Sequence, residues 1–152
     1  MDASEIKMNK PDRFKLIASL YLILIRDDKV LLMRRKHTGF EDGNYGLPSG
    51  HLEKNETLTE GLAREAKEEI GIDILPSDLQ LVEVMHRKHE DIRMDFFFVT
   101  NKYHNEPTNC EPEKCDDLQW FPLNNLPPNT IQYIRLAIEN YRKNITYSEV
   151  GW

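Results

Sequence analysis

The chain opens with apolar runs that predict two antiparallel strands. Residues 15–25 (KLIASLYLILI) and 29–35 (KVLLMRR) are rich in the aliphatic and aromatic residues that strands favour. Asp27 and Asp28 separate the two runs, and a two-residue break of this kind is typical of a β-hairpin turn. The pattern therefore predicts a hairpin over residues 15–35.

Further along, the pattern predicts three more strands and a closing helix. Residues 79–89, 92–103 and 118–123 are strand-like, whereas residues 131–141 repeat their apolar positions with helical spacing. The apolar stripe of the closing helix consists of Ile131, Ile134 and Ile138. Helices that interrupt several strands indicate an α/β fold, in which helices cover a mixed sheet.

Another helix is predicted between the two pairs of strands. It is expected to begin after Asn55 as its N-cap, with Glu56 in its first turn, where the helix dipole favours an acid. Gly71 is a normal helix-ending glycine. The side of this helix that we expect to be buried consists of Leu62, Ala66 and Ile70.

Three acids lie on one face of this helix. Glu65, Glu68 and Glu69 stand at i, i+3 and i+4, spacings at which like charges repel. Gly61 falls on the same face and would let a bulky charged group approach closely. A solvated acidic face is one interpretation. The other is a hard divalent cation, because Mg²⁺ takes oxygen ligands and commonly joins carboxylates to phosphates.

Composition limits the classes of protein to consider. At 152 residues the chain is expected to form one domain over residues 14–152, after a flexible polar leader at 1–13. A net charge of −6 argues against nucleic-acid binding, and no apolar run reaches the about 20 residues that span a membrane. Cys110 and Cys115 are interpreted as free thiols in a reducing, cytoplasmic compartment, with a small disulfide loop or a zinc site as alternatives.

Residues 50–72 (GHLEKNETLTEGLAREAKEEIGI) carry a pattern specific enough to name a family. Nine fixed positions are filled, by Gly50, Glu56, Arg64, Glu65, Ala66, Glu68, Glu69, Gly71 and Ile72. This stretch resembles the Nudix box of the Nudix hydrolases, and the resemblance extends over roughly residues 15–140. It implies an α/β/α sandwich with a mixed β-sheet, and hydrolysis of nucleoside diphosphates linked to another group with Mg²⁺ or Mn²⁺.

The resemblance also implies roles for individual residues. Glu65, Glu68 and Glu69 would be the metal ligands, and Glu65 is also a candidate base for the attacking water. The carbonyl of Ser49 would complete the metal site, although many members have glycine at this position. Arg64 would orient Glu56 and Glu65 through charge-assisted hydrogen bonds.

The substrate is assigned by elimination. Motifs of other subfamilies are missing, since His86 and His89 stand near the positions where the ADP-ribose and dinucleoside-polyphosphate types carry proline and tyrosine. The chain therefore looks most like a MutT-type pyrophosphohydrolase of nucleoside triphosphates, possibly with purine or oxidised purine bases. Nucleotide sugars or other nucleoside diphosphate derivatives are alternative substrates, and a non-catalytic nucleotide-sensing module is an alternative function. The expected partner is a small nucleotide, with no nucleic acid and no membrane, for a monomer or a homodimer.

Residues outside the box are candidates for the rest of the site. In a predicted loop at 105–117, Glu111 matches a MutT-like metal ligand or base, with Glu113 and Asp116 as competitors. Arg35 ends a strand near the site and could bind phosphate or base, or could simply be solvated. Asn129 could read a purine edge or cap the closing helix. The tail at 145–152 could dock on the domain or on a second subunit.

Overall fold

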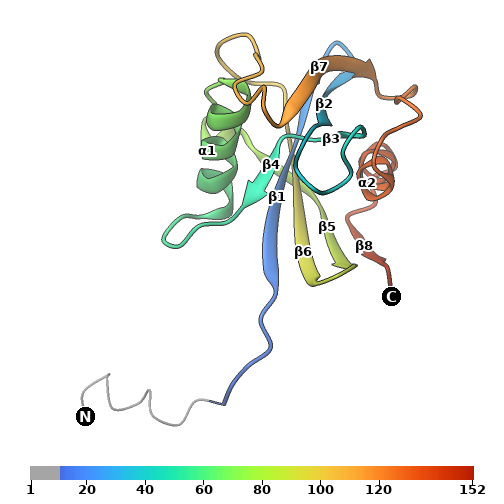
Figure 1. The fold of residues 1–152 in the computed structure, drawn as a ribbon. Coiled ribbons are helices and arrows are strands. Elements are labelled where there is room, and N and C mark those ends of the chain that lie inside the picture. Colours follow the sequence, from blue (N-terminus) through green and yellow to red (C-terminus); the bar gives the residue numbers. More distant parts are fainter. Residues whose placement is uncertain (1–10) are drawn as a thin grey trace.

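The computed structural model describes residues 11–152, which form one mixed sheet of eight strands with two α-helices (Figure 1). The strands are β1 (Ile17–Arg26), β2 (Lys29–Arg35), β3 (Tyr45–Gly46), β4 (Ser49–His51), β5 (Gln80–Lys88), β6 (Ile92–Thr100), β7 (Cys115–Pro122) and β8 (Tyr147–Val150). The main order is β3-β2-β1-β6-β5-β8, with β4 beside β1 and β7 beside β2. β1 and β6 pair in parallel, whereas β1–β2, β1–β4 and β5–β6 are antiparallel.

The two α-helices, α1 (Leu58–Ile70) and α2 (Gln132–Arg142), cover opposite faces of the sheet (Figure 1). Side chains of a strand alternate between faces, so β1 supplies both cores. Leu20, Leu22 and Leu24 pack in the cluster that contains the buried side of α1. Tyr21 and Ile23 pack in the cluster that contains α2. This arrangement confirms the predicted α/β/α sandwich.

The predicted hairpin is confirmed. β1 and β2 pair antiparallel at Arg26 and Lys29, and both turn residues, Asp27 and Asp28, have positive φ. Two left-handed residues make the turn whose twist matches that of the flanking strands, and aspartate tolerates this conformation.

The start of α1 differs from the prediction. The helix begins at Leu58, and Thr57 is its N-cap, accepting a hydrogen bond on its hydroxyl from the backbone of Glu60. Asn55 has a positive φ in the preceding turn, so it is not the cap, and Glu56 lies outside the first helical turn. Arg64 holds the Glu56 carboxylate just ahead of the helix, so Glu56 takes part in an ion pair instead of the first helical turn. The predicted end at Gly71 is correct, with φ of 71°.

The closing helix agrees with its predicted apolar stripe, because Ile131, Ile134 and Ile138 are all buried. Its N-cap is Ile131, without a side-chain hydrogen bond, so Asn129 is not the cap. The loop predicted at 105–117 ends earlier than expected. Residues from Cys115 onward belong to β7, because they pair with the end of β2.

The two ends of the described chain differ in how they relate to the sheet. Residues 11–16 are exposed and carry no helix or strand, and the remainder of the predicted leader lies outside the described residues. The tail docks on its own domain, where β8 pairs in parallel with β5. None of the helices within residues 11–152 is long and apolar enough to cross a membrane.

Candidate functional site

Arg64 lies at the centre of an ion-pair network on α1. Its Nε and Nη2 donate to the two carboxylate oxygens of Glu56 at 3.0 and 2.8 Å. Its Nη1 contacts Glu65 at 2.9 Å and, more loosely, Glu68 at 3.4 Å. The hydrogen bonds from Arg64, together with one from the Glu53 backbone, lower the pKa of Glu56 to about 2. Glu56 is therefore a fixed anion that holds Arg64 against the acidic face.

Two glycines allow these carboxylates to lie close to the backbone. A methyl group at Gly50 would overlap the carboxylate of Glu65. One at Gly61 would lie 2.7 Å from a carboxylate oxygen of Glu56 and 2.9 Å from Leu20. The charged group that approaches Gly61 is thus Glu56, and Gly50 lets β4 pack directly on Glu65.

Glu69 is recessed beside β4. One of its carboxylate oxygens accepts a hydrogen bond from the Ser49 backbone N–H at 3.1 Å. Burial raises the pKa of Glu69 to about 8, and the neighbouring charges of Glu65 and Glu111 act in the same direction. Burial also raises the pKa of Glu65, against its hydrogen bond from Arg64. Carboxylates held this close in a partly dry site need a cation to be charged together.

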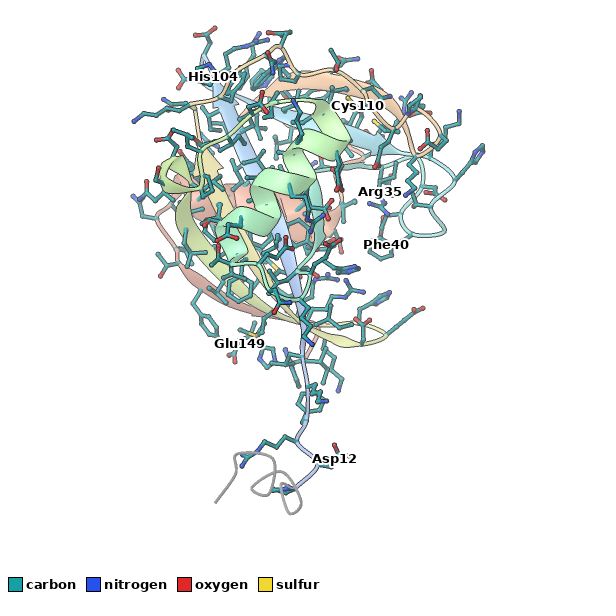
Figure 2. All side chains as sticks on the ribbon, turned by 90° about the vertical axis from the view of Figure 1, so that its left-hand side faces the viewer. Asp12, Arg35, Phe40, His104, Cys110 and Glu149 are labelled. Atoms are coloured by element: carbon teal, nitrogen blue, oxygen red, sulfur yellow. The ribbon has the colours of Figure 1, made fainter. Side chains whose placement is uncertain are left out.

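The loop before β7 brings Glu111 to the same place. Thr108 and Cys110 donate their backbone N–H groups to the carbonyls of Ile70 and Glu69, at 2.9 and 3.0 Å. These bonds satisfy the free carbonyls at the end of α1. Figure 2 shows Cys110 beside this end of the helix. Glu111 follows directly, which explains why its charge acts on both Glu65 and Glu69.

Glu69 and Glu111 border a cavity of about 570 Å³. Ser49, Gly50, Glu69 and Glu111 line one side of it, and Arg35 lines it as well. The cavity continues over the sheet to a more basic end, where its lining includes Tyr21, His51, Arg87, Arg93 and Tyr133. Glu65, Glu68 and Asn129 are not among the lining residues.

The donor set fits a hard divalent cation in chemical type, because carboxylates and backbone carbonyls are the ligands of Mg²⁺. The arrangement is not that of an assembled site, however. Within residues 11–152, no three histidine, cysteine, aspartate or glutamate side chains converge at metal-binding distance. The carboxylates of Glu65 and Glu68 instead form ion pairs with the Arg64 guanidinium.

Other candidates from the sequence have defined neighbours. Arg35 donates to the Phe40 carbonyl at 2.6 Å. Asn129 is exposed, and its amide donates to the Gly43 carbonyl at 2.8 Å. Asp116, a competitor of Glu111, pairs with Arg34 at 2.6 Å. Cys110 and Cys115 are both free thiols.

Sequence reasoning missed the basic end of the cavity. Arg87 is buried, donates to Asp95 at 2.6 Å and lies 3.8 Å from the centre of the Tyr133 ring. Arg93 pairs with Asp91 at 2.7 Å. The alternation of Arg87 with His89 at the end of a strand indicates one shared face, but it does not tell which loop faces them.

Comparisons with known proteins agree with this geometry. The NUDIX domain model matches residues 16–141. The chain is 31% identical over 124 residues to the ADP-ribose pyrophosphatase of Methanocaldococcus jannaschii, covering 80% of this chain and 70% of the relative. It is 30% identical over 129 residues to the NAD-capped RNA hydrolase NudC of Stutzerimonas stutzeri, covering 84% of this chain but only 45% of that relative. The chain thus spans less than half the length of this second relative.

Two further similarities concern MutT-type proteins. The 8-oxo-dGTP diphosphatase of Proteus vulgaris is 33% identical over 97 residues, covering 64% of this chain and 86% of the relative. The crystal structure of a MutT NUDIX hydrolase from Burkholderia pseudomallei superposes with a TM-score of 0.76 at 26% identity, covering 83% of this chain and 98% of that one. The box, the sandwich and these matches together show that the chain belongs to the Nudix hydrolase family, among its MutT-like members.

Proposed function

We propose that the chain is a Mg²⁺-dependent pyrophosphohydrolase that cleaves a phosphoanhydride bond of a nucleoside triphosphate, with purine or oxidised purine nucleotides as its substrates. The observation that carries the proposal is the pair of carboxylates, Glu69 and Glu111, that line a cavity together with Arg35, with the charge of Glu65 acting on Glu69 from close by. Mutually repelling carboxylates beside a basic side chain match a metal and a phosphate that bind together. Mn²⁺ has the same ligand preference and is the alternative ion.

Each residue has a proposed part in the reaction. Glu65, Glu68, Glu69 and the Ser49 carbonyl hold the metal, which supplies positive charge to the phosphoryl oxygens. Glu111 accepts the proton of the attacking water, with Glu65 as the other candidate base. Arg64 and Glu56 orient Glu65 from the side away from the cavity. Arg35 contacts the phosphates or the base.

A second candidate is a nucleoside diphosphate linked to a further group, such as a nucleotide sugar or ADP-ribose. The observation that favours it is the extension of the cavity to Arg87, Arg93, His51 and Tyr133, which leaves room for a second polar moiety. The relatives named ADP-ribose pyrophosphatase and NAD-capped RNA hydrolase support keeping this class.

Free thiols at Cys110 and Cys115 support the proposal of a reducing, cytoplasmic compartment.

A hydrolysis screen tests the proposal. Canonical and oxidised nucleoside triphosphates, nucleotide sugars, ADP-ribose and dinucleoside polyphosphates are compared with Mg²⁺ and with a chelator. The expected result is metal-dependent release of pyrophosphate and a nucleoside monophosphate from a triphosphate. Two monophosphate products from ADP-ribose at a higher kcat/KM would favour the second candidate. Nucleotide binding without turnover of any substrate would instead make the chain a sensing module.

Single substitutions assign the residues. Glu69→Gln is expected to lower turnover by about two orders of magnitude or more, because it removes a metal ligand. The metal-free variant is expected to melt no lower than wild type, since a neutral amide replaces a buried carboxyl group that is costly to ionise. Glu60→Gln, an exposed residue of the same helix, is the control.

For Glu111→Gln we expect a changed pH–rate profile, and an unchanged profile would leave Glu65 as the base.

A further inference from the structure

We propose that Phe40 and His89 form an aromatic clamp that stacks the nucleobase of the substrate at the entrance of the cavity. The inference rests on the proposed function and names the part of the substrate that this end of the cavity recognises. Both residues line the cavity, yet they come from different loops, one between β2 and β3 and the other between β5 and β6. Their ring centroids are 6.3 Å apart, and the ring planes are tilted by 59°.

The loop that carries Phe40 has a defined shape. The Asp42 carboxylate accepts hydrogen bonds from the Thr38 hydroxyl at 2.6 Å and from the backbone of Thr38 and Gly39 at 3.0 Å. The oxygen of the same hydroxyl accepts a hydrogen bond from the Phe40 backbone N–H at 3.2 Å. A ring at the tip of a braced loop loses little conformational freedom when a ligand stacks on it.

The far end of this loop is tied to the rest of the domain. The side-chain amide of Asn129 donates to the Gly43 backbone carbonyl at 2.8 Å. The backbone carbonyl of Asn129 accepts a hydrogen bond from the backbone N–H of Tyr45 at 2.9 Å. Asn129 does not line the cavity itself. Its contacts hold the end of the Phe40 loop in place.

Arg35 connects the clamp to the carboxylates. Its Nε donates to the Phe40 carbonyl, and its guanidinium carbon lies 5.4 Å from the centre of the Phe40 ring. Figure 2 shows Arg35 and Phe40 close together on the loop beside α1. The charge of Arg35 also acts on Glu69. A nucleotide whose phosphates lie between Glu69 and Arg35 would therefore present its base to Phe40.

His89 faces the cavity because of its position after β5. Arg87 lines the cavity from β5, and His89 lines it from the bend that follows the strand. The backbone N–H of His89 donates to the Asp91 carbonyl at 3.0 Å, which closes the turn into β6.

The spacing of the two rings suits one intercalated base after a small opening. Two stacked contacts of about 3.5 Å each need parallel planes about 7 Å apart. The two rings, with centroids 6.3 Å apart and planes tilted by 59°, therefore have to turn toward parallel and separate before a base can enter. Stacking of one base on an aromatic side chain stabilises binding by an amount equal to about a tenfold change in affinity.

Steady-state kinetics of the preferred nucleotide test the clamp. For Phe40→Leu and His89→Leu we expect KM to rise about tenfold with kcat nearly unchanged, because stacking acts on binding and not on the phosphorus. Phe40→Trp is expected to restore the wild-type KM. Phe14→Leu, an exposed phenylalanine that does not line the cavity, is the control. Unchanged KM in both leucine variants would overturn the clamp.

A binding measurement separates failure of the clamp from failure of the proposed function. The tryptophan of Phe40→Trp is titrated, against wild type, with a nucleoside triphosphate carrying an uncleavable α,β-methylene bridge and with inorganic tripolyphosphate, both with Mg²⁺. We expect the fluorescence of the introduced tryptophan to change when the nucleotide analogue binds and to stay the same with tripolyphosphate. A response to the analogue, together with no turnover of any cleavable nucleotide in the hydrolysis screen, would retain the clamp and reject the enzyme. Equal responses to both ligands, or none to the nucleotide, would reject the clamp.

Discussion

At the scale of single residues, the site depends on side chains that are absent as much as on those present. Gly50 and Gly61 leave the space into which Glu65 and Glu56 fit. Arg64 then gathers both carboxylates with one guanidinium. Glycine in a helix usually costs about 1 kcal/mol relative to alanine. At Gly61 this cost is offset, because a methyl group would collide with Glu56 and Leu20.

The consequence can be tested at Gly50. Gly50→Ala is expected to push the Glu65 carboxylate aside while the fold survives, since the colliding atoms belong to the end of a flexible side chain. A displacement of about 1 Å in a catalytic group can lower turnover about 100-fold. The matched control is Gly46→Ala, whose methyl group would meet only the tip of Ile131 at 3.2 Å. Equal turnover and melting temperature in wild type and Gly50→Ala would show that the position of Glu65 against β4 is not needed.

At the scale of elements, the irregularity in β5 joins three parts of the fold. The register with β6 shifts between Leu81 and Glu83. The Glu83 side chain is buried there, and one carboxylate oxygen accepts hydrogen bonds from Asn140 of α2 and Ser148 of β8, both at 2.8 Å. The other oxygen has no partner among the described residues. Glu83 therefore ties the helix and the tail strand to the sheet, but at a cost when it is charged.

This cost makes a stability prediction that depends on pH. Burial raises the pKa of Glu83, and the nearby charge of Asp95 raises it further, against the two hydrogen bonds. A raised folded-state pKa stabilises the fold below the unfolded pKa, and this contribution is lost as pH rises through the folded value. We expect wild type to lose more unfolding free energy than Glu83→Gln between about pH 5 and about pH 8. Urea unfolding of wild type and Glu83→Gln at both pH values measures this loss of unfolding free energy.

The control for this experiment is Glu113→Gln, which changes an exposed carboxylate in the loop before β7. Its loss of stability with pH should match that of wild type. If Glu83→Gln also matches wild type at both pH values, the buried carboxylate carries the same charge in the folded and unfolded chains, and the predicted linkage is wrong.

At the scale of the whole molecule, the C-terminal strand β8 completes one end of the sheet. β8 pairs with β5 from Val84 to Arg87, and Trp152 donates its indole N–H to the His86 carbonyl at 3.1 Å. The end of the chain thus covers the strand that carries the basic end of the cavity. It is part of the domain and not a free appendage.

Removal of the tail tests this integration. A chain that ends at Asn144 loses the β5–β8 pairing and the Ser148 hydrogen bond to Glu83. We expect a loss of about 2 kcal/mol, which lowers the melting temperature of a chain of this size by about 5 °C. Ser148→Ala separates the hydrogen bond from the strand and should have a smaller effect. Thermal unfolding of the three proteins decides the question, and an unchanged melting temperature in the truncated chain would show that the tail adds no stability.

The sequence by itself determined the features that follow from local spacing. The hairpin, the apolar stripe of α2, the end of α1 at Gly71 and the family pattern over residues 50–72 all depend on residues close together in the chain. Local periodicity and turn chemistry are enough to predict such elements. The substrate could only be proposed by elimination, because the residues that we propose to border the base lie in separate loops.

The tertiary structure decided everything that joins distant segments. Asn55 is a good helix cap by type, but Glu56 pairs with Arg64 ahead of the helix, and the N-cap is Thr57. The pairing of Phe40 with His89 could not be predicted from the sequence, since 49 positions separate them and only the packing of β1 between β2 and β6 brings their loops together. Contacts between distant strands depend on which strands become neighbours, and the local pattern of residues does not determine strand order.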